Sequence, residues 1–204
     1  MGRRAHLSAA LAAALVAVGS ALPAIGAAEG DAVGPEQAVR AFVDGCIEHE
    51  GQIAAVTDWA LAQGWVPVDP LQEAAARPLL EGAPGQVLQA SRRSSVLLLA
   101  VSAVGRCVVW ASDQDGPLVR LALLRAIAAL SARGARTRIE VDRTVEHDGA
   151  WRNVMQWSYR RPGGSKELRL GAATTIGAAP AAQALQLAPL PDAPAYQPDG
   201  QPTR

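Results

Sequence analysis

The stretch from residue 139 to residue 176 alternates between apolar and polar side chains, and this alternation constrains the fold more than any other feature. A period of two is that of a β-strand with one buried and one solvated face. Turn-forming residues interrupt the alternation at Asp148-Gly149 and at Gly163-Gly164. The pattern therefore predicts three consecutive antiparallel strands joined by two hairpins.

The register of these hairpins follows from which loop length keeps apolar side chains on one face. A two-residue turn at 148–149 would set Val141 opposite Gln156, which mixes the faces. We therefore expect a three-residue loop, 147–149, which pairs Val145 with Trp151, Val141 with Met155 and Ile139 with Trp157. A two-residue turn at 163–164 pairs Tyr159 with Leu168, Trp157 with Leu170 and Trp151 with Ile176.

The residues upstream predict another hairpin and a long helix. Residues 94–101 and 105–112 are almost entirely apolar, which is typical of central strands. Residues 117–133 follow the helix start Asp115-Gly116-Pro117 and carry a broad apolar stripe. Together these elements predict an α+β fold with an antiparallel sheet of about five strands in ββαβββ order. The long helix and the N-terminal helices are expected to cover one face of it.

Three helices are expected before the sheet. Gly34-Pro35 begins the first and Gly51 ends it, the second runs from about Gln52 to Gln63, and Asp69-Pro70 begins a short third. The apolar residues of the first helix recur at the spacing of one buried face: Val39, Phe42, Val43, Cys46 and Ile47.

The composition changes after Gly177, where alanine, proline and glutamine dominate. Prolines recur from residue 180 onward and block regular backbone structure. We therefore expect a single domain over residues 34–177 and a disordered tail over residues 178–204. An extended arm that touches the envelope or a partner is the alternative.

Residues 1–26 have the layout of a secretory signal peptide. Arg3 and Arg4 precede an uncharged apolar run from Leu7 to Leu22, and small residues follow. We expect cleavage between Gly26 and Ala28 and a periplasmic mature protein with no transmembrane segment. The alternatives are an uncleaved anchor, for which the run is short, and twin-arginine rather than Sec export.

The expected export decides how the two cysteines are interpreted. Cys46 lies on the buried face of the first helix, and Cys107 lies in an apolar strand. Because exported proteins meet an oxidising environment, we expect a disulfide. Closing a loop of about 61 residues stabilises a fold by about 4 kcal/mol from chain entropy. The alternative is a metal site in which Cys46 and His49 join Cys107 and His147.

Charge and motifs exclude several function classes. The chain has 19 basic and 19 acidic residues, and residues 1–26 contain two of the basic and none of the acidic ones. The mature protein therefore has 17 basic and 19 acidic residues, a net charge of −2. The arginines are spread along the chain, so a nucleic acid is not expected as a partner. The serines lie in no nucleophile motif, and no glycine-rich phosphate loop occurs.

Few residues remain as site candidates. Glu140, Asp142 and Glu146 alternate along one strand, on the face expected to be solvated. Trp59 and Trp65 are candidates for a small apolar groove, and packing across a helix end explains them equally well.

The sequence favours a non-catalytic periplasmic module that either binds a protein or a small apolar ligand or is associated with the envelope. No cofactor is implied. The alternative is a small hydrolase that uses His49 with nearby carboxylates.

Overall fold

The computed structural model describes residues 34–90, 96–147 and 149–190, so the expected signal peptide lies outside the described residues. These residues form one antiparallel sheet of eight strands in the order β1-β2-β3-β4-β8-β7-β6-β5. The strands are β1 (Val66–Pro67), β2 (Gly85–Gln89), β3 (Leu97–Ser102), β4 (Cys107–Gln114), β5 (Arg136–His147), β6 (Ala150–Arg160), β7 (Leu168–Thr175) and β8 (Ala181–Pro189). The mixed class is confirmed. The sheet is larger than the five expected strands, which correspond to β3 to β7.

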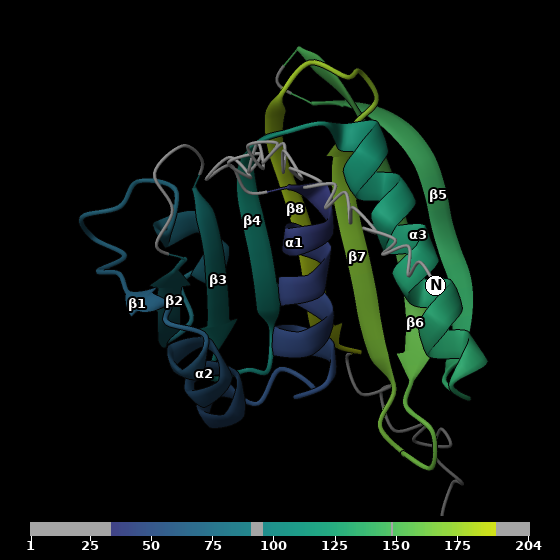
Figure 1. Cartoon of the computed structure of the whole chain (residues 1–204), viewed down its shortest axis with the longest axis horizontal. Helices are drawn as coiled ribbons and strands as arrows, with labels where there is room; N and C mark the ends of the chain where they lie inside the picture. The colour runs from purple at the N-terminus through teal and green to yellow at the C-terminus, as the bar shows by residue number, and fades with distance from the viewer. Residues whose placement is uncertain (1–33, 91–95, 148, 191–204) are drawn as a thin grey trace, which may run out of the picture. The chain divides into compact units, whose positions relative to one another are not determined.

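The helices α1, η1, α2 and α3 pack on one face of the sheet. The helices are α1 (Pro35–Arg40), the π-helix η1 (Ala41–Ile47), α2 (Ile53–Ala62), the 3₁₀-helix η2 (Arg77–Leu80) and α3 (Gly116–Ala132). In Figure 1, α1 and α3 lie in front of the strands. Side chains such as Phe42, Leu123 and Trp157 form one buried core between helices and sheet. The short helix expected from Asp69 is instead a series of turns that ends in η2.

The ends of α3 are fixed by local sequence. The Asp115 carboxylate accepts a hydrogen bond of 2.9 Å from the backbone N–H of Leu118. Pro117 lies in the first turn, where a backbone N–H would have no partner within the helix, so its missing N–H costs no hydrogen bond. Gly134 follows the last turn with a φ of 93°, which favours glycine. The expected helix over residues 117–133 is thus confirmed to within one residue.

The disulfide ties the first helix to the sheet. Cys46 in η1 and Cys107 at the start of β4 are bonded, with their Cα atoms 5.6 Å apart. Both residues are buried. Gly45 is required beside the bond, because a Cβ there would lie 2.7 Å from the Trp59 ring. The expected disulfide is confirmed, and the alternative metal site loses two of its four ligands to it.

The segment after Pro180 is a central strand, which corrects the expectation of a tail beginning at residue 178. β8 pairs with β4 on one side and with β7 on the other. Its alternate residues Gln183, Leu185 and Leu187 are buried. Pro180 precedes the strand and Pro189 ends it, so neither removes an inner hydrogen bond of the ladder. Residues 191–204 lie outside the described residues.

The β5–β6 hairpin contradicts the expected three-residue loop. His147 pairs with Ala150 and Val141 pairs with Gln156, as a two-residue turn requires. The register then shifts at Glu140, so that Ile139 still pairs with Trp157. A β-bulge inserts one extra residue and exchanges the faces beyond it. Consequently Asp142 and Glu146, which were expected toward water, lie on the same face as the helices.

The β6–β7 register is as expected, with Tyr159 opposite Leu168 and Trp157 opposite Leu170. Trp151 and Ile176, expected to pair on the apolar face, are instead 54% and 51% exposed. The first residue of α3, Gly116, lies against Thr175, the neighbour of Ile176.

Candidate functional site

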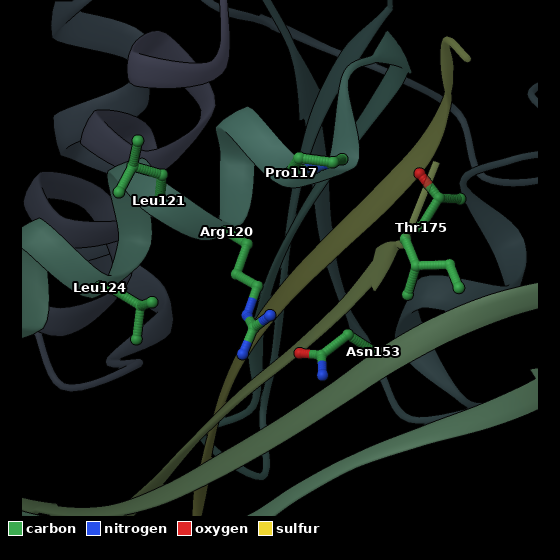
Figure 2. A pocket seen from close by; sticks show the side chains of 7 residues that line it. Pro117, Arg120, Leu121, Leu124, Asn153 and Thr175 are labelled. Carbon is green, nitrogen blue, oxygen red and sulfur yellow. The ribbon is translucent and has the colours of Figure 1, made fainter. Parts of the chain in front are cut away.

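A cavity of about 500 Å³ lies between α3, the N-terminal end of β6 and the C-terminal end of β7. We call it the α3 cavity, and it is lined by Pro117, Arg120, Leu121, Leu124, Asn153, Thr175 and Ile176. Figure 2 shows Arg120 reaching from the helix toward Asn153, with Leu121 and Leu124 further along α3. Its volume and its mostly apolar wall are those of small-molecule sites.

Two polar side chains that line this cavity, Arg120 and Asn153, pair with one carboxylate behind it, that of Asp142. Nη2 of Arg120 lies 3.4 Å from Oδ2 of Asp142 on β5. Nδ2 of Asn153 on β6 donates to Oδ1 of the same carboxylate at 3.0 Å. Because both charged side chains are partly exposed, solvent screens the ion pair and it adds little to stability. Its effect is to fix the position of the guanidinium and the amide.

Two atoms of this cluster are buried without a hydrogen-bond partner among the described residues. They are Nε of Arg120, a donor, and Oδ1 of Asn153, an acceptor. Asn153 as a whole is only 6% exposed. A buried polar atom left unpaired costs about 1–3 kcal/mol. The matching ligand chemistry is a group that both donates and accepts a hydrogen bond, such as a hydroxyl or an amide.

Apolar side chains surround the polar cluster. Leu121, Leu124 and Ile176 line the cavity and are largely exposed, and Trp151 is exposed beside them. The N–H of Ile176 donates to the carbonyl of Trp151 at 3.3 Å, which holds these two residues side by side. Exposed apolar residues gathered at a hollow mark a binding surface more often than scattered ones do.

The polar cluster was missed by sequence reasoning for an identifiable reason. Asp142 faces α3 only because of the bulge at Glu140, and alternation alone places it toward water. One signal was available in the sequence. Asn153, the single asparagine of the chain, stands in the otherwise apolar row of Trp151 and Met155. A polar residue at a core-facing position needs a partner or a role.

The two tryptophans proposed for an apolar groove pack against one another. The ring centroids of Trp59 and Trp65 are 6.1 Å apart. Trp65 belongs to the core, and Trp59 contacts Gly45. Neither residue lines the α3 cavity.

The carboxylates on either side of His49 are engaged elsewhere. Glu48 pairs with Arg133 at 3.2 Å, and Glu50 pairs with Arg161 at 3.4 Å. A cluster of His49 with free carboxylates, which the hydrolase alternative needs, is therefore not formed by these two neighbours.

A smaller cavity of about 220 Å³ lies at the C-terminal end of α3, lined by Glu48, Leu130, Arg133, Ala135, Tyr159, Arg161 and Pro162. Burial, and next the charge of Glu48, raise the pKa of Tyr159 above its ordinary value. The tyrosine therefore keeps its hydroxyl proton well above neutral pH. Since the charged residues here already pair with one another, we assign no ligand to this cavity.

The two histidines of the metal alternative lie at opposite ends of β6. Glu50, next to His49, reaches Arg161 beyond one end of that strand, whereas His147 pairs with Ala150 at the other. Within residues 34–90, 96–147 and 149–190, no group of three or more His, Cys, Asp or Glu residues is arranged to hold a metal ion.

No protein-family profile, curated protein or solved structure matches this chain. In the part of the chain that the structure describes, no helix is both long enough and apolar enough to cross a membrane. The function is therefore inferred from the geometry of the α3 cavity.

Proposed function

We propose that this chain is an exported, non-catalytic binding protein that holds a small, mostly apolar molecule in the α3 cavity. The observation that carries the proposal is the unpaired donor and acceptor, Nε of Arg120 and Oδ1 of Asn153, in an otherwise apolar hollow. Few polar groups in an apolar wall orient a ligand, while the wall supplies most of the binding free energy.

The charges at the cavity favour a neutral ligand group. Asp142 already neutralises Arg120 and accepts a hydrogen bond from Asn153. A ligand carboxylate would approach Asp142 and be repelled, whereas an alcohol or an amide would not. We therefore expect an apolar chain or ring that carries a hydroxyl or an amide.

Export is the second part of the proposal. It is supported by the charged, apolar and small-residue segments of residues 1–26 and by the Cys46–Cys107 disulfide, which fits an oxidising compartment. Mass spectrometry of the periplasmic fraction should find an N-terminus between Ala27 and Glu29. Recovery of the full-length chain with the inner membrane would contradict export.

Binding can be tested with N-phenyl-1-naphthylamine, a neutral apolar dye that fluoresces in apolar sites. We expect saturable binding, displacement by a medium-chain alcohol, and much weaker displacement by the carboxylate of the same length. Leu124→Gln places an amide in the cavity wall and should weaken dye binding about tenfold, or about 1.4 kcal/mol.

The matched control is Leu71→Gln, the same change at an exposed leucine outside the cavity. It should leave binding unchanged. Equal effects of the two substitutions, or no saturable binding, would contradict the proposal.

A further inference from the structure

The face of β5–β8 turned away from the helices concentrates arginine. Trp157 and Tyr159 on β6 point into the core. Because successive residues of a strand point to opposite faces, Ser158 and Arg160 point away from the helices. Residues directly opposite on neighbouring strands share a face. Arg136 is opposite Arg160, and Ser158 lies between Arg138 and Arg169.

The same face continues beyond the bulge. Arg152 and Val154 alternate with the core-facing Asn153, and they lie opposite Val145 and Arg143 respectively. We call this surface the arginine face, made of Arg136, Arg138, Arg143, Arg152, Arg160 and Arg169. These arginines are spread along the sequence, and the fold gathers them. A chain whose arginines are spread along the sequence therefore presents several of them on one face of its sheet.

Little negative charge balances the arginine face. β6, β7 and β8 contain no acidic residue. Glu140 at the bulge pairs with Arg138 at 3.2 Å. Arg136, Arg143 and Arg160 make no ion pair within the described residues. Like charges directly opposite on adjacent strands, as in Arg136 and Arg160, are destabilising unless an external anion compensates them.

Small and uncharged residues separate the arginines of this face. Gly171, Ala173 and Ala184 lie on its β7 and β8 side, and the uncharged side chain of Gln186 lies over Gly171. Four strands span about 14 Å at the usual strand spacing. The helices α1 and α3 are on the other side of the sheet.

We propose that the arginine face binds the surface of a membrane rich in anionic phospholipid. Guanidinium groups bind phosphate oxygens in bidentate geometry, and several of them on one plane match a layer of headgroups. A duplex nucleic acid requires an element that enters a groove, and a single strand requires exposed aromatic rings for stacking. The nearest tryptophan on this side, Trp110, is partly buried against the Val87 cluster.

This inference is independent of the proposed ligand. The α3 cavity lies between the helix and the opposite face of the sheet, so membrane contact and ligand binding use different residues. Loss of one activity by substitution should therefore leave the other intact.

Co-sedimentation with vesicles tests the proposal. The full chain should bind vesicles of equimolar phosphatidylglycerol and phosphatidylcholine, and binding should fall with added salt. Arg136→Gln with Arg160→Gln removes two unpaired charges, and each basic residue near an anionic surface contributes about 1 kcal/mol. The double variant should therefore bind about thirtyfold more weakly.

The control is Arg40→Gln with Arg125→Gln, an equal charge change at exposed positions on α1 and α3. Both variants keep the same N-terminus, so the apolar segment before residue 26 contributes equally to each. The control should bind as the parent chain does.

Three results would overturn the proposal. They are equal losses in the two double variants, equal binding to vesicles of phosphatidylcholine alone, and no binding to either vesicle. Binding of a single-stranded oligonucleotide without vesicle binding would replace the membrane by a nucleic acid.

Discussion

At the scale of the residue, Asn153 is the position where we expect binding and the stability of the free protein to favour different side chains. Its amide is almost fully buried, donates to Asp142 and leaves its own oxygen unpaired among the described residues. Neighbours at the same face of β6, such as Met155, are apolar. Binding sites often retain such destabilising groups because function requires them.

Asn153→Leu is expected to stabilise the free protein by about 1 kcal/mol, because it removes an unpaired buried acceptor and keeps the same branching and number of heavy atoms. The same change should weaken binding of a medium-chain alcohol about tenfold, since the hydroxyl loses its acceptor. Urea unfolding and dye displacement measure the two effects. A less stable variant with unchanged binding would show that the amide is structural.

The disulfide gives a second prediction for single residues. Cys46→Ser and Cys107→Ser should each lower the free energy of unfolding by about 4 kcal/mol, because each breaks the same bond. The double variant should be little worse than either single one. The measurement is urea unfolding under oxidising conditions, and additive losses would contradict a shared bond.

At the scale of the element, the strands were predictable and one register was not. Alternation located β5, β6 and β7, and apolar runs located β3 and β4. The expected β5–β6 register was wrong near the turn, because His147 pairs with Ala150 and only two residues are left between the strands. The bulge at Glu140 then restored the contact of Ile139 with Trp157. Alternation cannot show a bulge, and so the site residue Asp142 was placed on the wrong face.

Deleting Glu140 tests this register. The deletion removes the extra residue and preserves each pair on both sides, including Val141 with Gln156 and Ile139 with Trp157. We expect a change of about 1 kcal/mol or less in the free energy of unfolding, since the surface pair with Arg138 contributes little.

Deleting Thr144, in the same strand, is the matched control. It shifts residues 136–143 by one position and turns Asp142 away from Arg120. Urea unfolding should show a loss of several kcal/mol, on the order of other core-disrupting changes. Equal losses for the two deletions would mean that the bulge is required.

At the scale of the whole molecule, the last strand joins the two halves of the sheet. β8 lies between β4 and β7, so in the described sheet it is the strand that joins the β2–β4 and β5–β7 meanders. Composition concealed this strand, since alanine and proline suggested a tail. The alternation of Gln183, Leu185 and Leu187 was the physical signal that marked it.

A chain ending at Pro180 should fail to fold, because two central strands lose a neighbour and their edges are exposed. A chain ending at Leu190 keeps β8 and should fold as the full chain does. Circular dichroism and cooperative urea unfolding compare the two. A folded chain that lacks residues 181–190 would contradict the central place of β8.

The most direct test of the central claim is an NMR titration of the protein with a medium-chain alcohol. Binding in the α3 cavity predicts saturable amide shifts centred on Leu121, Leu124, Asn153 and Ile176, and loss of these shifts in Leu124→Gln. Shifts centred on Trp59 and Trp65, or shifts that do not saturate, would contradict it.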